Sequence, residues 1–312
     1  MNPPSLLDRR LVVVTGKGGV GKSTVSAALA LLASRAGKRV LVCEVGGQER
    51  VAPLLGAPRS GATTREARPG LFTVSVVPGA AMREYGVMVL RFRAVYDLVF
   101  ENRLMRYFLG AVPGLAELVT IGKILHEVKM VEDGRPRWDL VILDAPATGH
   151  AVQLLRVPAA LMDTVPAGPL RHDAEWMRAI LEDPGRTGLV LVTLPEEMPV
   201  NEAIELDAQV RDLLAIPRAA LFVNAMPEAR FTLEEHRLLE PLEVDGEPLG
   251  PAARAATLQA ARAESAAREL ARVRSAIDLP ATVLPLLARA EWGPEAVDRI
   301  AAALATAAGE AA

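Results

Sequence analysis

The chain of 312 residues has little cysteine, little lysine and no strong net charge. Its one cysteine, Cys43, excludes an internal disulfide and any metal or iron–sulfur site built from several cysteines of one chain. The net charge of −3, without a basic tail, gives no reason to expect nucleic acid as a partner. Residues 1–10 carry prolines and charges where a signal peptide needs an apolar run, and no stretch approaches the ~18 apolar residues of a membrane span. We therefore expect a cytoplasmic protein with no integral membrane segment.

Apolar residues are plentiful, at 51% of the chain against 23% charged residues, which is enough to build a core. The length exceeds the usual single-domain size, but α/β proteins often reach it with one core and an insertion. No linker rich in glycine and serine divides the chain. We therefore expect a single domain that spans residues 1–312.

Short apolar runs predict strands, and helical patterns lie between them. A strand at 11–15, a glycine loop, a helix at 23–36 and a strand at 39–45 form the start of a βαβ unit, which predicts an α/β fold with a mostly parallel, doubly wound sheet. Residues 80–131 are helical in pattern and longer than the roughly 10–15 residues that a crossover helix needs, so they are expected to form a helical insertion. Residues 251–276 alternate in charge and predict a solvated outer helix. Further strands are predicted at 71–77, 140–143, 189–194, 219–224 and 282–284.

The glycine loop has the pattern Gly, four residues, Gly-Lys-Ser, and it lies between a predicted strand and a predicted helix. Glycines let successive backbone N–H groups curve around phosphate oxygens, and the helix presents its positive end to the same anion. We therefore expect ATP or ADP to bind here. The predicted nucleotide-binding residues of this loop are Gly16, Gly18, Gly19, Val20, Gly21, Lys22, Ser23 and Thr24.

Individual roles follow from the chemistry of a magnesium-bound triphosphate. Lys22 is expected to reach the β- and γ-phosphates, and Thr24 to bond the α-phosphate. Mg²⁺ prefers oxygen ligands, so Ser23 is a predicted ligand. The strand at 140–143 ends in Asp144, which supplies the carboxylate that such a site needs. Lys22 and Asp144 are thus predicted catalytic residues.

Lys17 is a second lysine in the same loop, at a position where the side chain should point away from its own nucleotide. It is either a solvated lysine or a charge offered to the phosphate of another subunit, as an arginine finger is. We include it among the predicted catalytic residues. After Asp144, Gly149 is placed in a turn that can move when the γ-phosphate is lost, while His150 either holds that turn or touches a substrate or partner.

These motifs resemble a known family. The sequence from Lys17 to Thr24 is similar to the deviant phosphate loop of the P-loop NTPases that include MinD, ParA, the nitrogenase iron protein and ArsA. Asp144-Ala-Pro-Ala-Thr-Gly-His150, followed by Leu154-Leu-Arg-Val-Pro158, resembles the ArsA family, which comprises the arsenite-pump ATPase and its relatives that target tail-anchored membrane proteins.

The resemblance implies a dimer with a second P-loop subunit, either a homodimer or a heterodimer with a paralogue, in which the equivalent of Lys17 reaches across the interface. It implies that ATP closes the two halves and, in the targeting branch, shapes an apolar groove for a client helix. It also implies that Asn224, at the end of a late strand, contacts adenine.

Three departures from the family pattern limit what carries over. Family members have an aspartate after the second strand that orients the attacking water, and by register Pro53 falls at that position. Hydrolysis is then expected to be slow, unless Glu44, Gln48 or Glu49 takes the place of this aspartate or a partner chain carries the competent site. The cysteines of arsenite-sensing members are absent, and so is the zinc-binding Cys-x-x-Cys of the eukaryotic dimers.

Half of the aromatic side chains lie within residues 85–108, with Met88 and Met105 among them, in a chain that has 3 Trp, 3 Tyr and 6 Phe. They follow one helical face and are either the core of the inserted helices or an apolar groove for a partner. The aromatic residues are Tyr85, Phe92, Tyr96, Phe100, Tyr107 and Phe108.

Three functions follow, in order of preference. The first is a dimeric ATP-hydrolysing switch whose nucleotide state controls an apolar helical surface for a protein client. The second is a regulatory subunit that hydrolyses ATP poorly and pairs with a paralogous ATPase. The third, MinD- or ParA-type positioning on membrane or DNA, lacks a terminal basic helix and a basic patch.

Overall fold

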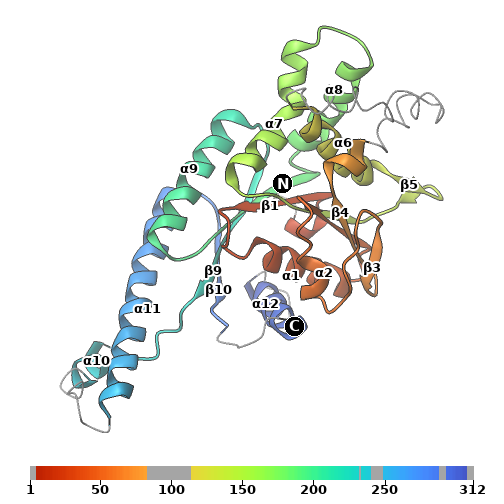
Figure 1. Cartoon of the computed structure of the whole chain (residues 1–312). Helices are drawn as coiled ribbons and strands as arrows, with labels where there is room; N and C mark the ends of the chain where they lie inside the picture. Colours follow the sequence, from red (N-terminus) through yellow and green to blue (C-terminus); the bar gives the residue numbers. More distant parts are fainter. Residues whose placement is uncertain (1–4, 83–113, 232, 240–248, 288–292, 308–312) are drawn as a thin grey trace.

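The computed structural model describes residues 5–82, 114–231, 233–239, 249–287 and 293–307. Its centre is an eight-stranded sheet with the strand order β10-β9-β8-β1-β7-β2-β4-β3 (Figure 1). These strands are β1 (Leu11–Gly16), β2 (Val40–Val45), β3 (Arg65–Arg68), β4 (Leu71–Val76), β7 (Leu140–Asp144), β8 (Thr187–Thr193), β9 (Arg218–Met226) and β10 (Ala281–Pro285).

Neighbouring strands of the sheet pair in parallel, except for β3, which pairs antiparallel with β4 at one edge. The predicted α/β fold with a mostly parallel sheet is therefore confirmed. The sequence did not predict β3, because its residues are polar and partly exposed and show no apolar run. A separate small hairpin, β5 (Val131–Glu132) and β6 (Arg135–Pro136), was also missed.

Helices cover both faces of the sheet, as the burial of every residue of β1 requires. Leu11 and Val13 belong to the core on one face, together with α6, α7, α8 and α9. Val12 and Val14 belong to the core on the other face, with α1 and α12. The helices are α1 (Lys22–Arg35), α2 (Val51–Leu54), α6 (Leu115–Lys129), α7 (Thr148–Thr164), α8 (Pro169–Glu182), α9 (Glu197–Leu213), α10 (Leu233–Leu239), α11 (Gly250–Ala276) and α12 (Pro294–Ala307), after a short 3-10 helix at Leu6–Asp8.

The expected insertion at 80–131 is described only in part. Its C-terminal portion is α6, which buries Leu118, Ile121, Ile124 and Leu125 against the sheet. This portion packs as a covering helix of the fold. The aromatic cluster at 85–108 lies outside the described residues, so the choice between core and groove stays open.

The long helix α11 lies at one end of the molecule and extends with α10 away from the sheet (Figure 1). Most of its surface is exposed, which confirms the predicted outer helix at 251–276. None of the helices in the described parts of the chain combines the length and the hydropathy that crossing a bilayer requires.

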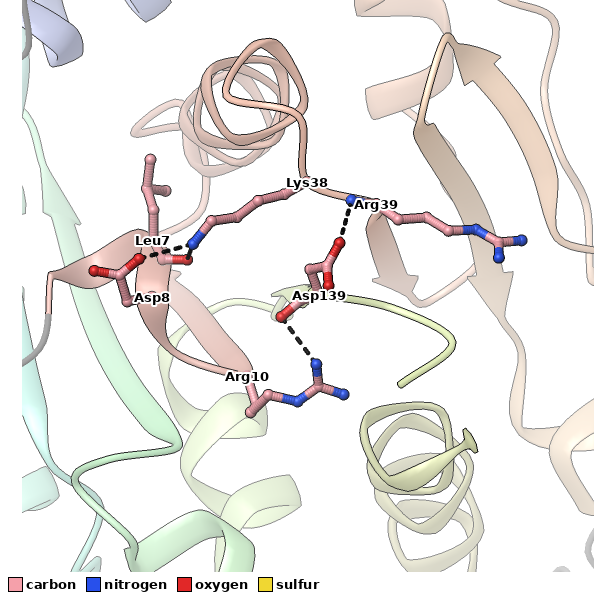
Figure 2. Close-up of polar contacts among 6 residues, drawn as sticks. All are labelled: Leu7, Asp8, Arg10, Lys38, Arg39 and Asp139. Carbon is pink, nitrogen blue, oxygen red and sulfur yellow. Dashed lines mark hydrogen bonds and ion pairs between the residues drawn. The ribbon is translucent and has the colours of Figure 1, made fainter. Parts of the chain in front are cut away.

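Polar contacts join the residues at the N-terminal ends of β1, β2 and β7 (Figure 2). The Asp139 carboxylate accepts a hydrogen bond from the backbone N–H of Arg39 at 2.8 Å, and the Asp139 carbonyl accepts one from the Arg10 guanidinium at 3.2 Å. Lys38 donates to the Leu7 carbonyl at 2.6 Å and to the Asp8 carboxylate at 2.9 Å. These contacts fix the N-terminal ends of the central strands. They thereby help to position the C-terminal ends of the same strands, where the P-loop and Asp144 lie.

Candidate functional site

The phosphate loop (P-loop, residues 16–24) leaves the carboxyl end of β1 and enters α1. Gly16 has a φ of +152°, and a Cβ added there would lie 2.2 Å from the Val192 carbonyl oxygen on β8. Gly21 has a φ of +92°, and a Cβ there would lie 2.2 Å from the Asn224 amide nitrogen. Because an L side chain would be both strained and blocked, these two positions require glycine.

Lys22 folds back over the loop. Its ammonium donates to the carbonyl oxygens of Gly16 at 3.1 Å and of Lys17 at 2.9 Å. Burial lowers the pKa of Lys22; the charge of Arg50 adds to this effect, and Asp144 opposes it. A partly desolvated ammonium that two loop carbonyls hold in place is suited to bind phosphate oxygens.

Asp144 lies at the end of β7, next to β1 in the sheet, and only 8% of the residue is exposed. Its carboxylate accepts hydrogen bonds from the hydroxyls of Ser23 at 2.7 Å and Ser26 at 3.1 Å. Burial raises the pKa of Asp144, while these bonds and the charges of Lys22 and Arg50 lower it. The residue is therefore a buried carboxylate whose ionised form a further cation would stabilise.

These oxygens fit Mg²⁺. Ser23 and Asp144 lie together as a hydroxyl and a carboxylate, the hard donors that Mg²⁺ prefers. Within the described residues no group of three or more His, Cys, Asp or Glu forms a metal cluster. The remaining ligands would be water and phosphate oxygens, the usual arrangement for Mg²⁺ at a nucleotide.

A cavity of about 660 Å³ opens beside the P-loop. Gly18, Gly19, Gly21, Lys22, Ser23, Thr24 and Asp144 line it, so the structure brings most of the predicted site residues together. Gly16, Lys17, Val20 and Asn224 do not line it. The other walls come from the segment between Glu44 and Arg59 and from Ala145 to Ala147.

Lys17 is bonded to a helix instead of facing the cavity. Its ammonium forms an ion pair with Glu202 of α9 at 2.7 Å, and the two side chains are 29% and 31% exposed. The side chain is thus neither free in solvent nor directed to the phosphates of its own chain.

Asn224 is buried under the P-loop, with 7% of the residue exposed. Its amide donates to the Val20 carbonyl at 2.9 Å. In this structure Asn224 braces the loop, a role that the sequence did not indicate, and adenine contact stays a prediction.

The two glutamates proposed as substitutes for the missing aspartate both accept hydrogen bonds from backbone N–H groups. One oxygen of buried Glu44 accepts the N–H groups of Arg50 at 2.6 Å and Val51 at 2.9 Å. Glu49 accepts the N–H groups of Ser60 and Gly61. Pro53 lines the cavity without a carboxylate, as the register predicted.

The turn after Asp144 leads directly into α7. Ala145, Pro146 and Ala147 line the cavity, and α7 begins at Thr148. His150 is exposed, and its backbone N–H bonds the Ala147 carbonyl at 3.0 Å. The turn therefore joins the phosphate site to a helix of the covering layer.

Sequence reasoning missed two cavity residues, Arg50 and Arg59. Neither belongs to a motif, and both reach the cavity through the course of the loop that follows β2.

A family model described as "Anion-transporting ATPase" matches residues 9–166. The chain is 33% identical over 235 residues to ATPase BagA of Mycobacterium tuberculosis, a match that covers 71% of this chain and 66% of that protein. It is 28% identical over 206 residues to an arsenical pump-driving ATPase of Escherichia coli, with 60% and 34% covered, and 27% identical over 161 residues to ATPase GET3 of Kluyveromyces lactis, with 49% and 46% covered. Each match spans less than two thirds of the relative. The chain belongs to the ArsA family of anion-transporting ATPases, and the resemblance seen in its motifs is confirmed.

Proposed function

We propose that the chain hydrolyses ATP and acts as a dimeric switch, in which Lys17 contacts the nucleotide of a second P-loop subunit. The observation that best supports this proposal is the direction of Lys17. It belongs to the P-loop yet does not line the cavity, and its ammonium forms an ion pair with Glu202 on α9. A lysine directed away from its own phosphates is available to the phosphates of a partner. An ion pair of two partly exposed side chains is weak enough to be exchanged for a phosphate contact.

The chemistry is positioning and charge stabilisation. Water forms a bond through its oxygen to the γ-phosphorus as the bond from that phosphorus to the bridging oxygen breaks. The electron pair of the broken bond remains on ADP, and the proton of water leaves with inorganic phosphate or into solvent. Lys22 holds the transferring group, and Ser23 and Asp144 would hold a Mg²⁺ ion that supplies positive charge against the phosphates.

In this proposal, a change of the bound nucleotide moves α7 and thereby alters the protein surface. The turn at 145–147 lines the cavity, and the helix that follows packs against α6 and α8 in the covering layer. The aromatic cluster at 85–108 precedes α6 in the chain. Loss of the γ-phosphate would move this layer, and we propose that it exposes or covers an apolar surface for a helical protein client. The relative named arsenical pump-driving ATPase acts, by that name, on a pump, which is consistent with work on a partner protein.

A complementation experiment tests the contact across the dimer. Lys17→Ala and Lys22→Ala proteins are each expected to hydrolyse ATP at a small fraction of the wild-type rate. In an equal mixture, half of the dimers carry one Lys17→Ala subunit with an intact Lys22, facing a partner with an intact Lys17. Turnover should therefore recover to about a quarter of the wild-type rate. A mixture no more active than its components would contradict the cross-subunit role.

A second candidate is a subunit that binds ATP and hydrolyses it poorly. The observation in its favour is Pro53 at the cavity wall, with Glu44 and Glu49 both engaged by backbone N–H groups. Steady-state turnover of the pure chain separates the two candidates, because brisk hydrolysis by the isolated protein would eliminate this one.

A further inference from the structure

Two arginines, Arg50 and Arg59, line the phosphate cavity together with Lys22 and Asp144. Arg50 donates from its guanidinium to the neutral amide oxygen of Gln48 at 2.8 Å. Within the described parts of the chain, no carboxylate lies within ion-pairing distance of either guanidinium. Most arginines with a described contact in this protein do have an acidic partner. Two exposed arginines that line one cavity without a described acidic partner therefore indicate an anionic ligand.

The backbone on either side of these arginines is held in place. Glu44 caps the N–H groups of Arg50 and Val51, and α2, which follows, packs on α1 of the P-loop. Glu49 accepts the N–H groups of Ser60 and Gly61, directly after Arg59. Both carboxylates are therefore used to fix the loop, and neither neutralises the arginine that it positions.

The two arginines share their cavity with the residue expected to reach the terminal phosphates. Lys22 and Asp144 line it together with Arg50 and Arg59. A phosphate bound at Lys22 would therefore lie in the space that both arginines border.

We propose that Arg50, with Arg59 beside it, binds the terminal phosphate of ATP from the same chain and stabilises the charge that develops as this phosphoryl group is transferred. This inference rests on the proposed function, since it takes ATP as the substrate of the site. Pro53, which supplies no carboxylate to orient water, lines the same cavity as the two arginines. The site thus uses cations of its own chain in place of a water-orienting acid.

Calorimetry and turnover assays test the proposal on four variants of the full chain. The probes are ADP and the non-hydrolysable adenosine 5′-(β,γ-imido)triphosphate, each with Mg²⁺. Arg50→Ala is expected to bind ADP within about twofold of the wild type, to bind the triphosphate analogue about tenfold more weakly, and to lose at least about a hundredfold in turnover. Arg59→Ala should show the same pattern to a smaller degree.

Arg50→Lys is expected to fall between wild type and Arg50→Ala, because an ammonium keeps the charge but cannot bind two phosphate oxygens in the fork geometry of a guanidinium. Arg268→Ala is the matched control, since Arg268 is an exposed arginine of α11 that pairs with Glu264 at 2.8 Å. It removes the same charge from the chain and should leave binding and turnover unchanged.

A mixture of Arg50→Ala with Lys22→Ala distinguishes action within one chain from action across the dimer. If Arg50 serves its own P-loop, neither subunit of a mixed dimer has a complete site, so no turnover is recovered. Recovery in this mixture would overturn the assignment to the same chain. Turnover and analogue affinity of Arg50→Ala within about twofold of the wild type would overturn the phosphate contact itself. Failure of the proposed function gives a different result, because the wild-type protein itself would then hydrolyse ATP poorly or bind neither nucleotide.

Discussion

Replacing buried Glu44 by glutamine should make the stability of the protein less dependent on pH. Only 4% of Glu44 is exposed, and burial raises its pKa from 4.5 to about 7, although the N–H groups of Arg50 and Val51 act in the opposite direction. Glutamine is nearly the same size, and its amide oxygen can accept the same two hydrogen bonds. The substitution therefore removes the titration and keeps the contacts that fix the loop.

The direction of this pH dependence follows from the protons that the folded and unfolded states bind. Between about pH 4.5 and about pH 7 the folded protein holds a proton on Glu44 that the unfolded chain has released, so stability falls as pH rises through this range and levels off above it. The shift from 4.5 to about 7 corresponds to about 3 kcal/mol over the full range, at 1.36 kcal/mol per pKa unit. Between about pH 5 and about pH 8.5 the Glu44→Gln protein should gain about 2–3 kcal/mol relative to the wild type.

Urea denaturation of both proteins at these two pH values, without nucleotide or magnesium, measures the effect. The comparison uses the difference between the two proteins, so that all other titrating groups cancel. If this difference is the same at both pH values, Glu44 is ionised in the folded state at low pH and the inferred desolvation is wrong.

Three further substitutions probe the P-loop and its partners. Asn224→Ala leaves a buried carbonyl of the loop without its donor and should cost about 1–3 kcal/mol in urea denaturation, whereas an unchanged midpoint would show that the loop does not need this brace. Glu202→Gln frees Lys17 from an ion pair worth at most about 1 kcal/mol, so steady-state turnover should rise, but by less than about fivefold; a decrease would mean that the pair itself supports catalysis. Gly16→Ala places a methyl group 2.2 Å from the Val192 carbonyl and should abolish nucleotide binding in calorimetry, and wild-type affinity would refute the close approach of these strands.

Features of this fold that depend on residues close together in the chain were predictable from the sequence. The strand at 11–15 and the helix at 23–36 are visible as a continuous apolar run followed by a helical pattern, and the structure places them at Leu11–Gly16 and Lys22–Arg35. The P-loop between them carries its own motif. The place of Asp144 beside the P-loop was predictable because the carboxyl ends of parallel strands lie on the same side of the sheet.

Features that depend on contacts distant in sequence were not predictable. Asn224 bonds a residue 204 positions away, and its bracing contact has no local pattern. The pairing of Lys17 with Glu202 depends on how α9 lies beside the loop. Arg50 and Arg59 lie in a loop whose course is set by backbone hydrogen bonds to two glutamates, so only the fold shows that they line the cavity.

Side chains hold the loops at both ends of the central strands, and the contacts at the cavity end bear on the proposed switch. Where the strands begin, side chains tie β1, β2 and β7 to their loops (Figure 2). Where they end, the same strands lead into the P-loop, the segment from Val45 to Arg59 and the turn into α7, and residues of all three line the cavity. Glu44 and Glu49 fix the second of these segments by accepting backbone N–H groups within it or directly after it. The proposed switch would therefore act mainly through the turn that follows Asp144 and leads into α7.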